Sequence, residues 1–255
     1  MTSRWGEARR RIGSRVQSLG RALEHPGRIQ RKLRGVRIDE DLAMLASRPY
    51  LRAASVRTIL DVGANEGQFA RTVLHLFPAA KVFSFEPLPS VQGALRTLAA
   101  SSGGRLAIEA CALGDREARA EFHVNTFSPT SSVLKPDRPI AALGDQVHVT
   151  STIEVPMRRL RDWAEATPLE DEILIKLDVQ GFEASVLRGA ADFLGRVHVV
   201  ITETTFAPIY QGQATLGELC SILEPSGFRY REAFGVVRDP GSGEPMWQDS
   251  VFVRD

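Results

Sequence analysis

Short apolar runs alternate with amphipathic segments along most of the chain. Several runs rich in Val, Ile, Leu and Phe have the length and β-branched character of buried strands, and segments with helical spacing of apolar residues follow them. Strands that alternate with helices indicate a parallel sheet with helices on both faces. We therefore expect a doubly wound α/β sheet, with strands at 58–62, 81–86, 105–110, 172–178 and 197–203 and helices near 67–77, 90–100, 182–190 and 215–225.

The C-terminal part departs from this alternation. Two apolar segments, 228–237 and 247–253, flank the turn-forming cluster Asp-Pro-Gly-Ser-Gly at 239–243, which predicts an antiparallel hairpin. An insertion at 115–170 separates the third and fourth strands, and in it alternating strands surround a polar loop at 126–135. We expect this insertion to contact the substrate, because it adjoins the carboxyl ends of the strands.

The N-terminal segment is predicted to be a helical extension, residues 1–54, that precedes the main domain at 55–255. Apolar residues recur at helical spacing within 3–35, although Pro26-Gly27 interrupts the pattern, and a further short helix is expected at 39–46.

Charge is distributed unevenly between these two parts. Residues 1–37 hold eleven Arg or Lys and two Glu, so this segment carries about +9 and the remainder about −8. A basic stripe of this kind suits docking on the protein's own body, on a partner or on an anionic membrane surface, and the sequence leaves these alternatives open.

The rest of the composition limits the class of protein. The 255 residues suffice for one large α/β domain with an appendage. Cys111 and Cys220 both lie in apolar surroundings, which indicates free thiols in a reducing compartment. We find neither a secretion signal nor an apolar stretch of membrane-spanning length, so we expect a cytoplasmic protein, with membrane association through the basic extension as the alternative.

The first motif with chemical meaning is the turn after the first strand. Gly63 and Gly67 allow a sharp bend and a close approach by a ligand, and the following helix presents free N–H groups. The pattern Asp61-x-Gly63-x-Asn65-x-Gly67 differs from the Gly-x-Gly-x-x-Gly of dinucleotide folds. Glu86, nineteen residues past Gly67, ends the second strand and can accept hydrogen bonds from both hydroxyls of a ribose.

The acid in this turn changes the expected ligand. A carboxylate at Asp61 would repel a pyrophosphate, but it could hold a cationic group such as the methionine end of S-adenosylmethionine. A turn that uses glycine only to close is the alternative interpretation.

Two further acids stand at strand ends. Asp178 and Glu203 follow the fourth and fifth strands, so a parallel sheet places them on the same edge as Gly63 and Glu86. They could bind a divalent cation such as Mg²⁺ that lowers the pKa of an acceptor hydroxyl, or one of them could act as general base. Alternatively, Asp178 pairs with Lys176 and both acids cap the turns that follow.

Histidine is the usual general base at neutral pH, and two histidines lie in the insertion. His123 and His148 are therefore candidate bases, with surface histidines on half-exposed strands as the alternative. His75 falls in a predicted helix and His198 in a predicted buried strand, so neither is a candidate.

Several motifs occur in a fixed order between residues 55 and 236. They are Asp61-Val-Gly-Ala-Asn65-Glu-Gly67, Phe85-Glu86-Pro87, Leu160-Arg-Asp162-Trp163, Leu177-Asp178-Val-Gln180-Gly181-Phe-Glu183 with Val186-Leu-Arg-Gly-Ala190, and Ile201-Thr-Glu203 with Tyr210 and Gly227-Phe228. In this order the motifs resemble the FkbM-type methyltransferase family. The resemblance implies dependence on S-adenosylmethionine, a Rossmann-like class I methyltransferase fold, and methylation of hydroxyls on sugars or polyketide-derived products.

The resemblance also implies roles for individual residues. The methionine and ribose portions of the cofactor are expected to contact Asp61, Gly63, Asn65 and Gly67. Glu86 is expected to contact the ribose. The motif that contains Asp178, Gln180 and Glu183 is expected to lie nearest the acceptor.

We therefore predict an S-adenosylmethionine-dependent O-methyltransferase acting on a sugar, a glycolipid or a related natural product. A non-catalytic cofactor-binding scaffold ranks second, although such a protein would be expected to lose Asp61, Glu86 or Asp178. Nucleic-acid methylation ranks third, because the main domain is acidic and lacks an Asn-Pro-Pro-Tyr-type motif for a flipped base. A nicotinamide-dependent oxidoreductase is disfavoured, since it would need a Gly-x-Gly-x-x-Gly turn and a catalytic Tyr-x-x-x-Lys or similar motif, and neither appears in the sequence.

Overall fold

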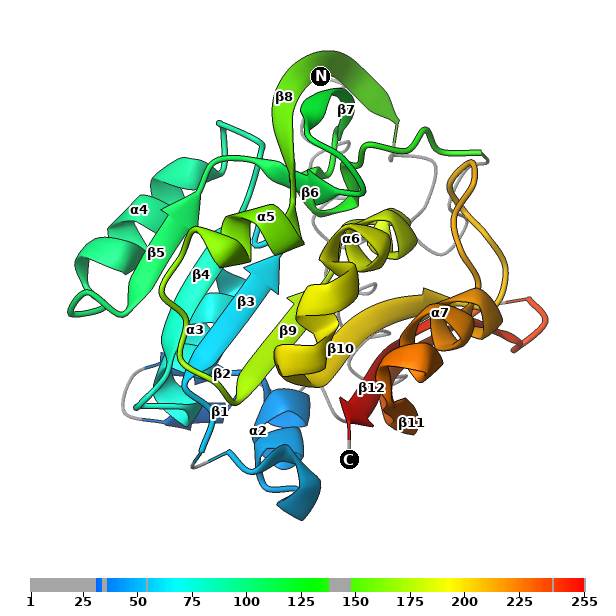
Figure 1. Cartoon of the computed structure of the whole chain (residues 1–255). Helices are drawn as coiled ribbons and strands as arrows, with labels where there is room; N and C mark the ends of the chain where they lie inside the picture. The colour runs from blue at the N-terminus through cyan, green and yellow to red at the C-terminus, as the bar shows by residue number, and fades with distance from the viewer. Residues whose placement is uncertain (1–30, 34–35, 54, 138–147, 240, 255) are drawn as a thin grey trace, which may run out of the picture.

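A seven-stranded mixed sheet lies at the centre of the protein (Figure 1). The computed structural model describes residues 31–33, 36–53, 55–137, 148–239 and 241–254. The sheet strands are β3 (Thr58–Val62), β4 (Lys81–Phe85), β5 (Leu106–Glu109), β9 (Ile173–Leu177), β10 (Val197–Thr205), β11 (Phe228–Arg238) and β12 (Pro245–Arg254).

The strand order is β11-β12-β10-β9-β3-β4-β5. The five strands from β5 to β10 pair in parallel, whereas β12 is antiparallel to both β10 and β11. The predicted doubly wound sheet, mostly parallel with an antiparallel C-terminal hairpin, is therefore confirmed, and it has the class I methyltransferase architecture. All five residues of β3 are buried, as expected for the central strand of a parallel sheet.

Helices cover both faces of the sheet. They are α2 (Glu40–Ala46), α3 (Gln68–Leu76), α4 (Gln92–Ala100), α5 (Leu160–Glu165), α6 (Glu183–Ala190) and α7 (Leu216–Leu223), with short 3-10 turns η1 (Pro49–Leu51), η2 (Ser128–Thr130), η4 (Ala191–Arg196) and η5 (Glu224–Ser226). Apolar residues of α2, α3 and α4 pack on one face, and those of α5, α6 and α7 pack on the other.

The insertion forms a small sheet of its own above the carboxyl ends of the main strands (Figure 1). Its strands are β6 (Ala112–Gly114), β7 (Ala118–Asn125) and β8 (Val149–Arg159), in the order β6-β8-β7. β7 and β8 pair antiparallel, so the two alternating strands predicted in the insertion are confirmed.

The N-terminal prediction is partly wrong. Residues 31–33 form β1 (Arg31–Leu33), which pairs antiparallel with β2 (Val36–Ile38), instead of the end of a helix. Gly35 disfavours a continuing helix, and Val36 and Ile38 are β-branched residues that favour a strand. The predicted helix over residues 3–30 lies outside the described residues.

The expected short helix at 39–46 is confirmed as α2. The Asp39 side chain accepts hydrogen bonds from the backbone N–H groups of Asp41 and Leu42 and so caps its first turn. Cys111 and Cys220 are free thiols, as predicted.

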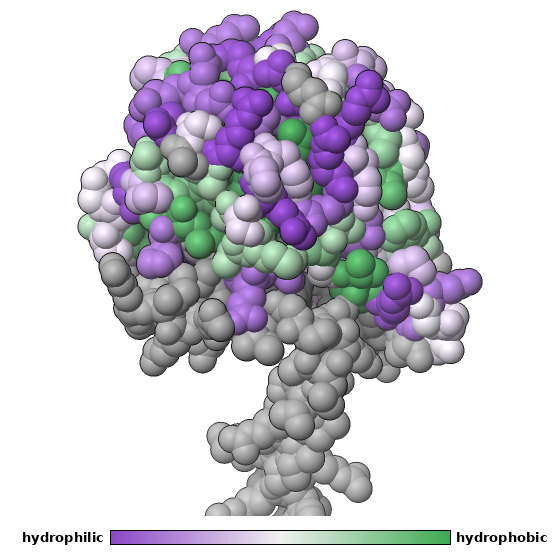
Figure 2. Space-filling view, turned by 90° about the horizontal axis from the view of Figure 1, so that it is seen from below, coloured by the Kyte–Doolittle hydropathy of each residue, from purple (hydrophilic) through white to green (hydrophobic). Residues whose placement is uncertain are grey.

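Seen from below, the described surface is mostly hydrophilic, with smaller apolar areas between the polar ones (Figure 2). Within the described part of the chain, no helix has the length and apolar character needed to cross a membrane.

Candidate functional site

A cavity of about 560 Å³ opens where β3, β4 and β9 end. Gly63, Asn65 and Glu86 line it on one side and Asp178 on another, so the structure brings together four of the predicted site residues. Its size suits a small-molecule ligand.

The glycine turn is shaped for close approach of two loops. Gly63 has φ +82°, and a Cβ atom there would lie 2.0 Å from the backbone oxygen of Asp178. Asn65 and Gly67 also have positive φ, +48° and +84°. Gly63 is therefore required by the packing of the β3 turn against the β9 turn, in addition to any ligand that lies against it.

Glu86 ties two turns together at the cavity wall. Its Oε2 atom accepts a hydrogen bond from the Asn65 N–H at 2.8 Å, and its Oε1 atom accepts one from the Leu88 N–H at 2.7 Å. Burial raises the pKa of Glu86 to about 7, although these two hydrogen bonds oppose the rise. Each carboxylate oxygen keeps a lone pair for a further donor, such as a ribose hydroxyl.

Asp61 lies below the cavity rather than in its wall. It is fully buried, and its register partners in the sheet are Ser84 and Lys176. Its Oδ2 atom accepts a hydrogen bond from Ser84 Oγ at 3.2 Å, whereas Oδ1 has no partner among the described residues. Burial raises the pKa of Asp61 to about 6. Asp61 lies outside the described lining of the cavity, so its predicted contact with the cofactor stays a prediction.

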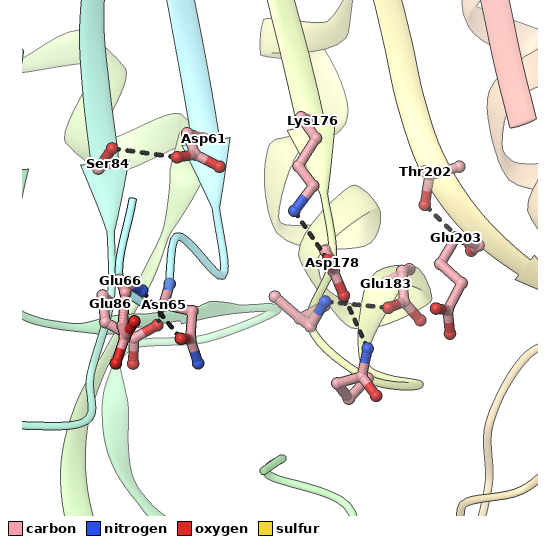
Figure 3. Close-up of polar contacts among 12 residues, drawn as sticks. Asp61, Asn65, Glu66, Ser84, Glu86, Lys176, Asp178, Glu183, Thr202 and Glu203 are labelled. Carbon is pink, nitrogen blue, oxygen red and sulfur yellow. Dashed lines mark hydrogen bonds and ion pairs between the residues drawn. The ribbon is translucent and has the colours of Figure 1, made fainter. Parts of the chain in front are cut away.

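Asp178 is held by both of its carboxylate oxygens (Figure 3). Lys176 Nζ lies 2.9 Å from Oδ2, and Gln180 Nε2 donates to Oδ1 at 2.7 Å. The Tyr210 hydroxyl oxygen lies 3.1 Å from Gln180 Oε1. The predicted pairing with Lys176 is therefore confirmed, and Asp178 lines the cavity at the same time.

Lys176 is a charged residue within a buried strand. Burial lowers its pKa, but the carboxylates of Asp178 and Asp61 outweigh burial, so the pKa lies above the ordinary lysine value. The ammonium group therefore stays charged and neutralises part of the acidic surroundings.

Two more acids lie close to Asp178. Glu183 accepts hydrogen bonds from the N–H groups of Val179 and Gly181, and burial raises its pKa to about 7. Burial and the nearby charges of Asp178 and Glu183 raise the pKa of Glu203 well above the ordinary value. The described lining of the cavity includes Asp178 but not Glu203.

A metal ion receives no support from this geometry. Within the described ranges, no group of three or more His, Cys, Asp or Glu side chains is placed to hold one. The Lys176 ammonium already neutralises Asp178, so the metal role predicted for Asp178 and Glu203 stays a prediction.

The two candidate histidine bases lie away from the cavity, whose described lining includes neither of them. His123 is buried in β7, with its Nδ1 atom 3.1 Å from Thr152 Oγ1, so the expectation of a half-exposed residue is wrong. Burial and the nearby charge of Lys135 lower its pKa. His148 is exposed and precedes β8. A catalytic role for either histidine stays a prediction.

Sequence reasoning missed several cavity residues. From the insertion, Phe122, Ser128 and Val133 line the cavity, and Ser128 Oγ lies 3.4 Å from Asn65 Nδ2. Phe234 and Asp249 line it from the C-terminal hairpin. The only sequence signal for such residues is a polar or aromatic position that breaks a strand pattern, as Lys176 does in Ile173-Leu-Ile-Lys-Leu177.

Two relatives similar in sequence agree with the resemblance in the motifs. The 2-O-methyltransferase NoeI of Sinorhizobium fredii (strain NBRC 101917 / NGR234) is 31% identical over 172 residues, which cover 65% of this chain and 70% of that protein. The 31-O-demethyl-FK506 methyltransferase FkbM of Streptomyces tacrolimicus is 26% identical over 194 residues, which cover 67% and 72%. The solved structure of Aeropyrum pernix fibrillarin with natively bound S-adenosyl-L-methionine has a TM-score of 0.46 and 14% identity, covering 82% of this chain and 74% of that one.

The family comparison is more decisive than any single relative. Residues 61–230, more than half of the chain, match the family described as "Methyltransferase FkbM domain". The matched range contains the glycine turn, Glu86, Asp178 and Glu203. This chain therefore belongs to the FkbM family of S-adenosylmethionine-dependent methyltransferases.

Proposed function

We propose that this protein is an O-methyltransferase that methylates a hydroxyl of a sugar, a glycolipid or a related natural product. One observation carries the proposal: Asp178 lines the cavity beside the Gly63 turn, with both of its carboxylate oxygens already oriented. A cofactor on the Gly63 turn and an acceptor would thus meet at one fixed carboxylate. The name of the relative NoeI, a 2-O-methyltransferase, supports transfer to oxygen.

The cavity wall fits S-adenosylmethionine. The free lone pairs of Glu86 suit the ribose hydroxyls, and Phe85, Leu88 and Leu113 offer apolar surface for an adenine ring. When bound, the cofactor supplies a methyl group on a good leaving group, so the protein mainly has to align the acceptor and remove its proton.

Asp178 is the better of the two carboxylates for the acceptor proton. Lys176 and Gln180 hold its carboxylate in place, and Asp178 lines the cavity. Glu203 lies outside the described lining of the cavity, and burial and the neighbouring carboxylates raise its pKa well above the ordinary value. We assign the base or orienting role to Asp178.

Simple measurements distinguish two alternative hypotheses, a magnesium-dependent enzyme and a non-catalytic scaffold, from this proposal. If Mg²⁺ bound at Asp178 and Glu203, EDTA would abolish methyl transfer and added Mg²⁺ would restore it. If the protein were a scaffold, it would bind the cofactor without transferring a methyl group to any acceptor.

Membrane contact through residues 1–37 is a separate proposal, supported by the charge of about +9 on that segment. Flotation with anionic liposomes tests it by comparing the full chain with a chain that lacks these residues. Equal behaviour of the two would contradict membrane docking and favour self-docking of the segment.

The experiment that tests the central proposal is titration calorimetry followed by label transfer. We expect S-adenosylmethionine and S-adenosylhomocysteine to bind and NADH not to bind. Label from methyl-tritiated cofactor should then move to a carbohydrate or glycolipid fraction in a bond that is stable to base, as an ether is. Failure of both sulfur compounds to bind would overturn the proposal.

A further inference from the structure

The cavity has two ends with different walls. At the turn end, Leu88, Phe122 and Val133 belong to the apolar cluster that joins the insertion to the loop after β4. At the other end, Leu42, Phe69 and Ile201 belong to the apolar cluster under α2 and α3, with Phe234 packed against it. We call this second region, formed by Leu42, Phe69, Ile201, Phe234 and Asp249, the hairpin end.

Strand register builds the polar part of the hairpin end. Asp249 of β12 lies directly opposite Glu203 on one side and Phe234 on the other, and opposed residues share a face of the sheet. Asp249 is also close enough to Lys176 to raise its pKa. The hairpin therefore adds the carboxylate of Asp249 next to that of Glu203. The aromatic ring of Phe234 lies on the other side of Asp249.

An irregularity in β11 shapes the backbone at the hairpin end. The register of β11 and β12 shifts after Phe234, and Gly235 has φ +60°. A Cβ atom on Gly235 would lie 3.1 Å from Asp249 Oδ2, so glycine leaves room for the carboxylate. Bulges of this kind commonly aim side chains beside active sites.

The wall on the α2 side is fixed to the same hairpin. Arg48, just after α2, donates from Nε to Glu232 Oε1 and from Nη2 to Glu232 Oε2, both at 3.0 Å. Glu232 lies two residues before Phe234 on β11. This ion pair connects the segment after α2 to the hairpin that carries Phe234.

The hairpin end extends beyond the part of the chain that matches the family. Leu42, Phe234 and Asp249 lie outside the matched residues 61–230, whereas Gly63, Glu86 and Asp178 lie within them. A family with one methyl donor and different acceptors needs a common wall for the donor and a variable wall for the acceptor.

We propose that the hairpin end binds the acceptor, and that the acceptor presents a sugar ring there. One apolar face of a pyranose packs on Phe69 and Phe234, and its hydroxyls donate to Asp249 and to Asp178. An aromatic surface combined with carboxylates matches a ring that has C–H groups on its faces and O–H groups on its rim. This inference rests on the proposed function, and it places acceptor recognition on the hairpin instead of the insertion.

Saturation-transfer NMR tests the inference without knowledge of the full acceptor. The full-length protein is saturated with S-adenosylhomocysteine and mixed with methyl glycosides of glucose, galactose, mannose, rhamnose and fucose. We expect transfer to at least one glycoside. Phe234→Ala and Asp249→Asn should each weaken that signal about fivefold or more, as expected for loss of a ring contact or of a hydrogen bond to a charged group.

Matched variants identify the cause of any loss. Phe234→Tyr keeps the ring and should keep the signal, and Phe127→Ala removes an exposed phenylalanine of the insertion that is outside the cavity lining and should change nothing. Asp249→Asn preserves shape, so it tests the site even if Phe234→Ala folds poorly. All four variants should bind S-adenosylhomocysteine as the unaltered protein does, by calorimetry.

Three results would overturn the inference while leaving the methyl donor in place: no glycoside binds, binding persists in both Phe234→Ala and Asp249→Asn, or Phe127→Ala alone abolishes it. Absence of S-adenosylhomocysteine binding in the unaltered protein would instead contradict the proposed function itself.

Discussion

Glu86 shows how one side chain serves both the fold and the site. Its carboxylate anchors the turns at Asn65 and Leu88, and burial places its pKa at about 7. Ribose hydroxyls would donate to the ionised form, so ligand binding and proton release are linked. A sequence motif predicts the ribose contact, but not that the same group titrates near neutral pH.

Adenosine binding should therefore depend on pH. Adenosine lacks the methionine amino group, so its affinity reports on the nucleoside contacts alone. We expect the affinity to rise as the pH increases from about 6 to about 8, because Glu86 loses its proton in this range. Glu86→Gln should bind adenosine about tenfold more weakly and without this pH dependence. Calorimetry at three pH values measures both, and an equally steep pH dependence in the variant would exclude Glu86 as its source.

Gly63 and Gly93 should respond in opposite ways to replacement by alanine. Gly63→Ala places a Cβ atom against the backbone of Asp178 at a positive φ, so we expect a loss of about 3 kcal/mol or more of unfolding free energy. Gly93 lies in α4 with no atom within 4 Å of an added Cβ, so Gly93→Ala should stabilise the protein by about 0.5–1 kcal/mol. Urea titrations measure both. A tolerated Gly63→Ala would contradict the close approach of the β3 and β9 turns.

At the scale of elements, the insertion is tied to the turn that carries Asp178. Ser132 Oγ donates to the carbonyl oxygen of Gln180 at 2.7 Å and accepts from the Leu134 N–H at 3.0 Å. Tyr210 donates to the carbonyl oxygen of Thr130 at 2.9 Å. The insertion therefore positions the turn around Asp178 as well as covering the cavity.

Ser132→Ala should loosen this connection. It removes one donor and one acceptor from a buried position, at a cost of about 1–3 kcal/mol. We expect faster amide hydrogen exchange at residues 128–136 and 178–181 and little change in β3. Ser47→Ala, which removes an exposed hydroxyl that donates to the Met44 carbonyl oxygen, is the control. Unchanged exchange in the Ser132 variant would show that other contacts hold the insertion in place.

Local patterns explain which elements the sequence predicts well. β3 is a fully buried strand, apolar except for Thr58 and Asp61, that ends at a glycine turn. Its observed bounds equal the predicted ones, because the buried run and the turn are both encoded within a few residues. The meeting of Phe234 with Asp249, or of Tyr210 with Gln180, depends on strand register and on loop paths between distant residues. No periodicity in either segment carries that information. β1 was missed because three residues before a glycine contain too little pattern to distinguish strand from helix.

At the scale of the whole molecule, several carboxyl groups are buried at one edge of the sheet around a single lysine. Burial raises the pKa of Asp61 to about 6 and those of Glu86 and Glu183 to about 7, and it also raises the pKa of Glu203 well above the ordinary value. The folded protein therefore holds protons that the unfolded chain releases at lower pH. The same acidic edge would attract a cationic sulfonium ligand. Burial of these carboxyl groups therefore lowers the stability of the ligand-free protein, and a bound cationic cofactor would offset part of this cost.

This burial gives the ligand-free protein an unusual pH dependence of stability. Where the native state binds more protons than the unfolded state, the unfolding free energy falls as pH rises. We expect the melting temperature to be about 5 °C lower at pH 8 than at pH 6.5, as loss of a few kcal/mol would produce. The lowered pKa of His123 acts in the opposite direction only near and below 6.5, so it leaves this window largely unaffected. Calorimetric melting at several pH values measures the slope, and Glu203→Gln should reduce it, because the amide carries no proton to release. A melting temperature that rises with pH across this window would show that these carboxyl groups are solvated in the folded protein.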